Sequence, residues 1–376
     1  MRRKNHKLHL VPVVSPSCGN GKSTLALALA MRLCAMGRRV VLIDTSLNQG
    51  LFHICRNAGI QENRKAAHSG IGKFLSDDCL DWGWVRENAL PFIAVPHTIG
   101  KLWVFPNQDF GEMRDMNCCL ESQVPLLRNR LNFMFWLLDD HIRPEIVIFD
   151  TGLGLWWWSD FILDTVVNHL EGTIVDKLKI VNNPLVVTSH GSGKTTQLLD
   201  EVRLMHTFYN FPAKRTDRPF DELDEKQCQN NWGVVANHLP GALEDLEATA
   251  KRLLREENER ALAANPECHF VFPEDKRRHF EESLRLITSA TNFFAPQVPS
   301  LVDLYRTTTE GGDLASRVKA DGERLLAALF GSAEGVTSTN GSDNYCKQVE
   351  NFRFDPALIA WHKVIGNIAG WILASK

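Results

Sequence analysis

A glycine-rich stretch near the N-terminus has the residue types of a loop that binds phosphate groups. Its candidate binding residues are Gly19, Asn20, Gly21, Lys22, Ser23 and Thr24. The stretch lies between an apolar, strand-like run at 8–14 and a helix-like run at 25–36. At such a junction the backbone N–H groups and the helix N-terminus bind phosphate oxygens, the lysine reaches the β- and γ-phosphates, and the next hydroxyl binds Mg²⁺. This pattern predicts a site for ATP or ADP with Mg²⁺.

The match to the P-loop pattern G-x-x-x-x-G-K-[ST] is incomplete, because Pro16 stands at the position of the first glycine. A structural turn that carries Gly-Lys-Ser and binds nothing is the alternative. The surrounding pattern favours phosphate binding, since strand, loop and helix are followed by a second apolar run, 40–43, that ends in Asp44. A strand-end carboxylate beside such a loop organises Mg²⁺.

A second acidic residue follows the apolar run 145–149. Asp150 ends this run and precedes a turn that begins at Gly152. A carboxylate there can hold a Mg²⁺-bound water, and a glycine allows the loop to move when a γ-phosphate changes. We therefore expect Asp44 and Asp150 to be the catalytic carboxylates. The expected metal ligands are Ser23 and, through water, Asp150, and the alternative is that Asp150 only caps its strand.

Composition and charge bound the class of protein. The chain has 376 residues, of which 44% are hydrophobic and 23% are charged, as in an ordinary globular protein. A net charge of −3 gives no reason to expect DNA as a partner. Nine cysteines without C-x-x-C spacing indicate reduced thiols and a cytoplasmic protein. The sequence has neither a signal-peptide pattern nor an apolar run of about 18 residues, so we expect no membrane span.

Apolar runs alternate with helical patterns along most of the chain. Several runs are uninterrupted Val, Ile and Leu, which is typical of parallel strands covered on both faces. We therefore predict an α/β fold, with a doubly wound, mostly parallel sheet and helices on both faces. The expected strands are 8–14, 39–43, 102–105, 145–149, 185–188, 233–236 and 269–272, and the clearest helix is 244–264.

The composition changes near residue 330. Residues 1–330 hold all the predicted strands and form the expected nucleotide-binding domain. Residues 331–344 are rich in Gly, Ser, Thr and Asn, which predicts a flexible linker. Residues 345–376 become apolar again and form a tail, in which Asp355 and Pro356 make a good helix start.

The predicted tail helix has an amphipathic surface. One arc of it holds Trp361, Val364, Ile365, Ile368, Trp371 and Ile372. A tethered amphipathic helix with two tryptophans is typical of an in-plane membrane anchor, which predicts peripheral contact with the inner face of the membrane. A helix that docks on the sheet or on a partner protein would show the same pattern, and this alternative stays open.

A second stretch, 189–196, also follows an apolar run and opens a helical pattern. It too lacks the first glycine of the P-loop pattern, since Thr188 stands there. The next predicted strand ends in Asn237, so the sequence offers no strand-end carboxylate to organise Mg²⁺. We therefore expect a glycine-containing turn, with a phosphotransferase that uses this loop as the alternative.

Five short motifs, in chain order, resemble the ParA/MinD family of P-loop ATPases, and most closely its MinD and flagellar-number-regulator members. The matching segments are 18–24 (CGNGKST), 41–44 (VLID), 150–154 (DTGLG), 234–237 (VVAN) and 272–275 (FPED). The resemblance implies that Asn237 reads the adenine and that Pro273 and Asp275 close over the base. It also implies an ATP-dependent switch or scaffold in spatial positioning or partitioning, a homodimer and a protein cargo.

Two positions depart from the family pattern. Ser17 stands where the family has its signature lysine, and Ser46 stands at the second carboxylate of the Asp-x-Asp triplet. Both losses bear on hydrolysis more than on nucleotide binding, because a lost transition-state contact costs roughly 3–5 kcal/mol. The resemblance therefore implies weak or no hydrolysis, with a non-hydrolysing interaction scaffold as the alternative.

Overall fold

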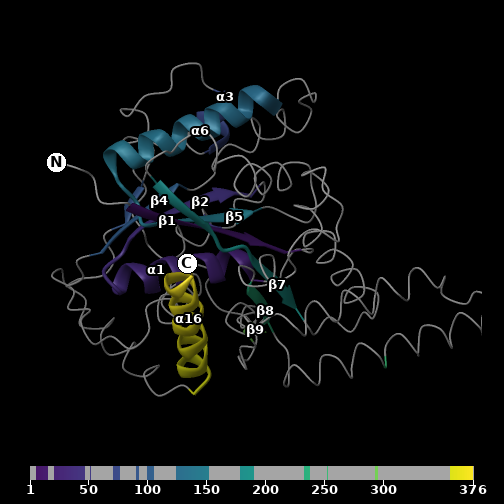
Figure 1. The fold of residues 1–376 in the computed structure, drawn as a ribbon. Coiled ribbons are helices and arrows are strands. Elements are labelled where there is room, and N and C mark those ends of the chain that lie inside the picture. The colour runs from purple at the N-terminus through teal and green to yellow at the C-terminus, as the bar shows by residue number, and fades with distance from the viewer. Residues whose placement is uncertain are drawn as a thin grey trace, which may run out of the picture.

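The computed structural model describes residues 6–15, 21–46, 51, 71–76, 90–92, 100–105, 124–151, 178–189, 233–237, 252, 293–294 and 356–375. These residues form a central sheet with helices on each side (Figure 1). The strands are β1 (His6–Val14), β2 (Arg39–Thr45), β3 (Leu90–Phe92), β4 (Lys101–Phe105), β5 (Ile146–Thr151), β6 (Leu178–Asn182), β7 (Leu185–Ser189), β8 (Gly233–Asn237) and β9 (Phe293–Phe294). The helices are α1 (Lys22–Ala35), α3 (Ile71–Ser76), α6 (Val124–His141) and α16 (Pro356–Ala374).

The sheet is mostly parallel. The strand order is β3-β4-β2-β5-β1-β7-β8-β9, and β6 pairs with the first part of β1. β3 runs antiparallel to β4, whereas the other described pairs are parallel. β2 and β5 are buried along almost their whole length, as expected for aliphatic strands covered on both faces. The predicted α/β class and mostly parallel sheet are confirmed.

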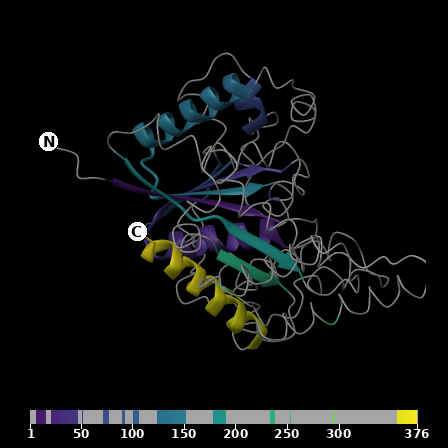
Figure 2. The same cartoon turned by 45° about the vertical axis from the view of Figure 1, so that its right-hand side comes forward.

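Each face of the sheet has its own core, because side chains alternate across a strand. Val40 and Leu42 of β2 pack in the core formed with α1 and α16. Val41 and Ile43 of the same strand pack in the core formed with α3 and α6. The rotated view shows these helical layers on opposite sides of the strands (Figure 2). Helices therefore cover both faces, as the doubly wound prediction requires.

Six of the predicted strands are observed, as β1, β2, β4, β5, β7 and β8. The short strands β3, β6 and β9 are not indicated by the sequence pattern. The predicted strand at 269–272 and the linker at 331–344 lie outside the described residues, as does the helix at 244–264 apart from Arg252.

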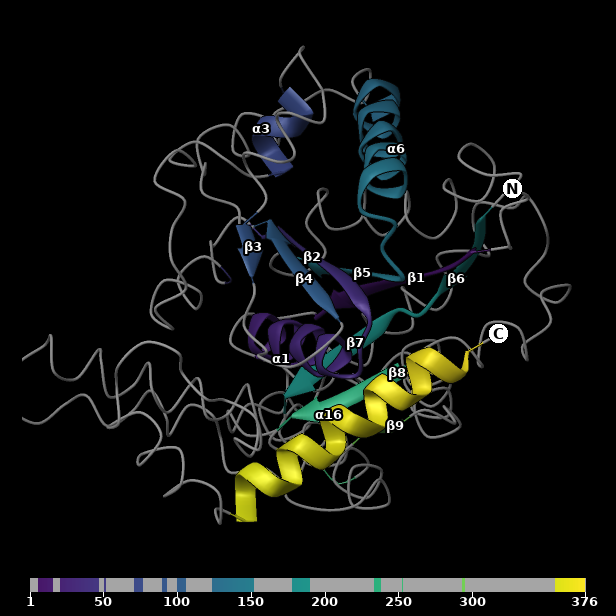
Figure 3. The same cartoon turned by 90° about the vertical axis from the view of Figure 1, so that its left-hand side faces the viewer.

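Helix α16 packs against α1 in the core rather than standing apart from it (Figure 3). Trp361, Ile365, Ile368 and Ile372 are each no more than 2% exposed. The apolar face that could have met a membrane is therefore buried against protein, and the docking alternative is the one observed. None of the described helices combines the length and apolar character that crossing a bilayer requires.

Polar contacts attach the end of α16 to the centre of the sheet. Lys7 Nζ donates to the Ser375 carbonyl oxygen. Asn183 Nδ2 donates to Ser375 Oγ at 2.7 Å, and Asn183 Oδ1 lies 3.1 Å from His9 Nδ1. Burial lowers the pKa of His9, and it outweighs the opposing effect of the Asn183 hydrogen bond. Asn183 thus connects His9 in β1 with Ser375, the residue directly after α16.

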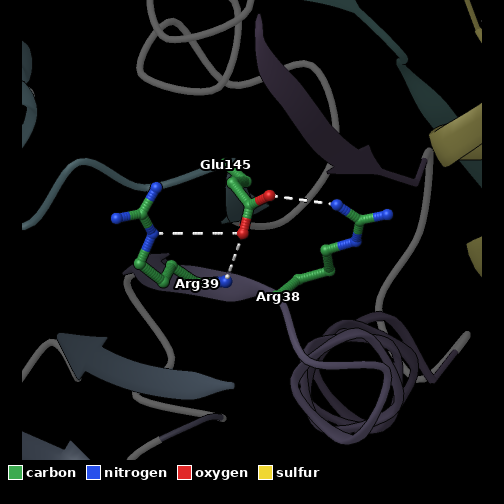
Figure 4. A network of polar contacts seen from close by, with 3 residues as sticks. All are labelled: Arg38, Arg39 and Glu145. Carbon is green, nitrogen blue, oxygen red and sulfur yellow. Dashed lines mark hydrogen bonds and ion pairs between the residues drawn. The ribbon is translucent and has the colours of Figure 1, made fainter. Parts of the chain in front are cut away.

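Glu145 lies directly before β5 and contacts Arg38 and Arg39 at the start of β2 (Figure 4). Its Oε1 accepts a hydrogen bond from Arg38 Nη1 and its Oε2 one from the Arg39 backbone N–H, both at 3.0 Å. Its own N–H donates to Arg39 O, and its carbonyl accepts from His9 N, both at 2.9 Å. Burial acts to raise the pKa of Glu145, but the contacts with Arg39 and Arg38 outweigh it and lower that pKa. These bonds hold β1, β2 and β5 in register.

We predict that Trp361→Ala lowers the free energy of unfolding by about 3 kcal/mol or more, because removing a buried tryptophan leaves a cavity. Lys363→Ala, on the exposed side of α16, is the matched control and should change it by less than about 0.5 kcal/mol. Urea denaturation followed by circular dichroism measures both. Equal stability of the two variants would show that α16 is not part of the folded core.

Candidate functional site

Helix α1 begins directly after Gly21, at the glycine-rich stretch. Gly21 adopts a left-handed conformation, with φ 80° and ψ 18°, which strains any residue that has a Cβ. Its carbonyl oxygen accepts the first helical hydrogen bond, from Leu25 N at 2.9 Å. Among the described residues no side chain caps this helix, and its first turn has no acidic residue. The start of α1 therefore has the polarity of an anion-binding helix terminus.

The side chains at the start of α1 are largely buried. Lys22 is 8% exposed and Thr24 is 7% exposed, while Ser23 is half-buried. A lysine ammonium that is this buried needs polar or charged neighbours. Asp150 is one such neighbour, because Lys22 acts electrostatically on its carboxyl.

The two strand-end carboxyls lie on adjacent strands. In the register of β2 and β5, Asp44 is paired directly with Asp150. On the other side of β5, Asp150 is paired with Val13, one residue before the end of β1, the strand that leads into the loop. Both aspartates are fully buried. The sheet therefore brings both carboxyls and the start of α1 to one edge, where ligands of open α/β sheets bind.

Hydrogen bonds from two threonines hold these strand ends together, and neither residue was identified from the sequence. Thr45 Oγ1 donates to the Asp150 carbonyl at 2.9 Å. Thr151 Oγ1 donates to the Val13 carbonyl at 2.8 Å. Each threonine directly follows one of the two aspartates, and this repeated Asp-Thr pair is the signal that could have identified them. Their hydroxyls hold the backbone of the carboxyl-bearing residues in place.

The Asp150 carboxyl lies in an environment that opposes ionisation. Burial raises its pKa to about 6, although the Ser23 hydroxyl and the Lys22 ammonium act to lower it. Neither carboxyl oxygen has a hydrogen bond of normal geometry in the described structure, so the Ser23 contact is a loose one. A buried carboxyl without close donors is costly to ionise, and an adjacent cation removes that cost. This arrangement fits a divalent cation.

Asp44 has a different environment, formed by Ser46. The Ser46 backbone N–H and its hydroxyl both donate to Asp44 Oδ1, at 2.8 and 2.6 Å. Ser46 is itself 5% exposed. Ser46, the third residue of the triplet, is therefore a hydrogen-bond donor that orients Asp44. A carboxylate at that position would place a second negative charge against it.

The protein groups available as metal ligands at this site indicate which metal ion would fit. The described residues contain no group of three or more His, Cys, Asp or Glu that could hold a metal by themselves. Mg²⁺ differs from zinc in needing only one or two protein oxygens, because waters and substrate phosphates supply the rest. Ser23 and Asp150 match that requirement. We therefore expect Mg²⁺ to bind together with a phosphate ligand and not alone.

The remaining predicted residues divide into two groups. Asn237 ends β8, whose parallel pairing with β7 places it opposite Ser189 at the carboxyl edge of the sheet. The residues that lie outside the described part of the chain are Ser17, Gly19, Asn20, Pro273 and Asp275, together with the second glycine-rich stretch beyond Ser189. The structure thus brings together Gly21, Lys22, Ser23, Asp44 and Asp150, and it places Asn237 on the same edge.

No protein-family model and no curated protein sequence matches this chain. Solved structures are similar to it in fold. Apo McdA from Cyanothece is 13% identical with a TM-score of 0.44, over 96% of this chain and 99% of that one. pNOB8 ParA bound to nonspecific DNA is 15% identical with a TM-score of 0.43, over 98% and 97%. MinD from Aquifex aeolicus is 15% identical with a TM-score of 0.40, over 85% and 97%.

At 13–15% identity the likeness extends to the fold alone. What the site binds must therefore follow from this chain's own residues.

We predict that the ligand-free wild type loses stability relative to Asp150→Asn as pH rises from about 4 to above 6. The folded state holds the Asp150 proton more tightly than the unfolded state, with a pKa of about 6 against 3.8. Ionisation therefore costs folding free energy, up to about 3 kcal/mol, which is absent below pH 4 and complete above pH 6. Urea denaturation at several pH values measures the difference. Parallel pH profiles for the two proteins would contradict the prediction.

Proposed function

We propose that this chain binds ATP or ADP with Mg²⁺ where β1 leads into α1. The observation that carries the proposal is the buried Asp150 carboxyl, which lies near the Ser23 hydroxyl and the Lys22 ammonium at the start of α1. An anion-binding helix start, a buried lysine and a buried strand-end carboxyl provide for a phosphate and its metal together. A purely structural turn requires none of these three features.

Each residue has a distinct role in this proposal. The backbone from Gly19 to Thr24 binds phosphate oxygens, and Lys22 neutralises the terminal phosphates. Ser23 and Asp150 hold Mg²⁺, Asp150 through water. When bound, Mg²⁺ neutralises phosphate charge, and the γ-phosphate supplies the difference between two states of a switch.

The base would be recognised further along the same edge of the sheet. By resemblance, Asn237 reads the adenine, and Pro273 and Asp275 close over it. Support for the role of Asn237 comes from its place at the carboxyl end of β8, the same edge that carries Asp44 and Asp150.

We propose that hydrolysis is weak or absent. Ser17 stands at the position of the family's signature lysine, and Ser46 stands at the second carboxylate of the triplet. For Ser46, support for weak hydrolysis comes from the two hydrogen bonds that it donates to Asp44. They give Ser46 a role in orienting Asp44, and a hydroxyl cannot supply the missing carboxylate.

In the cell, the resemblance favours an ATP-dependent switch or scaffold in spatial positioning or partitioning, in the cytoplasm and with a protein cargo. A nucleotide-dependent homodimer belongs to the same proposal. Peripheral membrane contact through α16 would require this helix to leave the core, because its apolar face is buried there. DNA is not proposed as a partner, since the net charge is −3.

We predict that Lys22→Ala weakens ATP binding by about tenfold to 100-fold, because it removes a charged hydrogen-bond donor to phosphate. Lys194→Ala, in the second glycine-rich stretch, is the matched control and should leave the affinity almost unchanged. Calorimetric titration with ATP and Mg²⁺ measures both. The reverse order of the two variants would move the site to the second stretch and favour the phosphotransferase alternative.

We also predict that ATP turnover by the wild type is far below about 1 s⁻¹, the low end for ordinary enzymes. The physical reason is that Ser17 and Ser46 supply neither the charge nor the carboxylate that the family uses for hydrolysis. Phosphate release at saturating ATP and Mg²⁺ measures the rate, with Lys22→Ala as the background control. A rate of about 1 s⁻¹ or faster that Lys22→Ala abolishes would refute this part of the proposal.

A further inference from the structure

The outer face of α6 carries apolar side chains that neither core uses. The large hydrophobic side chains that are exposed in the described part of the chain are Met36, Leu126, Phe133 and Trp136, and three of these four lie on α6. Trp136 is 52% exposed and Leu126 is 51% exposed. Phe133 and Trp136 stack, with ring centroids 5.7 Å apart and ring planes 15° from parallel.

The inner face of α6 is already fully used. Leu131 and Leu138 are completely buried in the core on that side of the sheet. Figures 1 and 2 both show α6 as an outer layer, on the side of the sheet away from α1 and α16. The outward apolar side chains therefore form a second apolar surface on the same helix. Exposure of this surface to water is unfavourable, and a partner would cover it.

Five of the exposed residues of α6 form one narrow stripe. The stripe consists of Leu126, Asn129, Phe133, Trp136 and Asp140, all of which are exposed. The positions are separated alternately by three and four residues, so at 3.6 residues per turn they fall within an arc of about 80°. This alternation is the spacing by which two helices pack along their length.

We propose that the occupant of this stripe is a second copy of the chain, whose own α6 packs antiparallel to the first. The last four positions are symmetric about a point between Met134 and Phe135. An antiparallel copy therefore places Phe133 against Trp136 of the second copy, and Trp136 against its Phe133. The same operation places Asn129 opposite Asp140. A two-fold contact requires this kind of reciprocal pairing.

The charges on α6 select the antiparallel direction. Asp140 is the charged residue in the stripe, whereas Arg128 and Arg130 lie on other sides of the helix, and Arg130 donates to the Leu75 carbonyl oxygen of its own chain. An antiparallel copy places Asp140 opposite Asn129 and opposes the two helix dipoles, whereas a parallel copy would bring the two Asp140 carboxylates together. A lipid surface fits this face less well, because the aspartates close to Trp136 are repelled by anionic headgroups.

The proposed dimer should be weak and independent of nucleotide. A helix pair of 18-residue helices covers less area than a standard stable interface of about 1,600 Å², so we expect a dissociation constant in the micromolar range. The stripe does not include the strand ends that carry Asp44 and Asp150. Failure of nucleotide binding would therefore leave this inference intact, and failure of the dimer would leave the proposed nucleotide site intact.

Analytical ultracentrifugation of the nucleotide-free chain, from about 1 to about 100 µM, tests the association. We expect a monomer–dimer equilibrium in which Trp136→Glu raises the dissociation constant by about tenfold or more, since it disrupts two reciprocal aromatic contacts. Met36→Glu, an exposed apolar side chain on the opposite helical layer, is the matched control and should leave the equilibrium unchanged. A wild type that stays monomeric throughout would overturn the proposal, as would equal effects of the two variants.

Asn129→Lys is a second variant that does not depend on disrupting the helix. It should strengthen association by about two- to fivefold, because the new ammonium lies opposite Asp140 of the second copy. Within one α6 these two positions are 11 residues apart, too far to pair. Unchanged or weaker association in this variant would count against the antiparallel register.

Disulfide mapping tests the direction of the pair. Asn129→Cys and Asp140→Cys proteins are mixed and oxidised, and peptide mass spectrometry identifies the linked positions. We expect links between 129 and 140, and predominant 129–129 and 140–140 links would overturn the antiparallel arrangement.

Co-sedimentation of monomeric protein with phosphatidylglycerol vesicles, lost in Trp136→Glu, would assign the stripe to a membrane and overturn the proposal.

Discussion

The parallel register of β2, β5 and β1 is the constraint on which the candidate site depends. In this register Asp44 lies beside Asp150, and Asp150 lies beside the strand that leads into the glycine-rich loop. A shift of one residue would turn the carboxyl of either aspartate to the other face of the sheet. Glu145 opposes such a shift at the amino ends of the strands, and Thr45 and Thr151 oppose it at the carboxyl ends.

The acidic residues at the two ends of these strands, Glu145 and Asp150, have opposite environments. Glu145 accepts hydrogen bonds from two arginine residues, and its pKa is lowered. Asp150 has no comparably close donor, and burial raises its pKa. The first arrangement stabilises a fold whether or not a ligand is present. The second is unfavourable in the ligand-free chain, and such local departures from good packing concentrate at binding sites.

Sequence patterns predicted the central strands and the main site residues because these signals are local. β2 and β5 each contain an uninterrupted apolar run that leads directly to an aspartate near the end of the strand. The edge strands β3 and β9, three and two residues long, are too short to leave a periodic signal. The amphipathic pattern of α16 predicted a buried face but could not tell protein from lipid, since both accept the same side chains. The stripe on α6 was not predicted, because a sequence pattern does not show which apolar side chains of a helix stay exposed in the fold.

The central claim is that Asp150 must ionise to hold the Mg²⁺ of a bound nucleotide. Calorimetric titration with Mg²⁺ and ATP at pH 6, repeated in buffers of different ionisation enthalpy, counts the protons released on binding. With a pKa of about 6, the account predicts that the wild type releases about half a proton more than Asp150→Asn. Equal proton release by the two proteins, or no binding by the wild type, would contradict it.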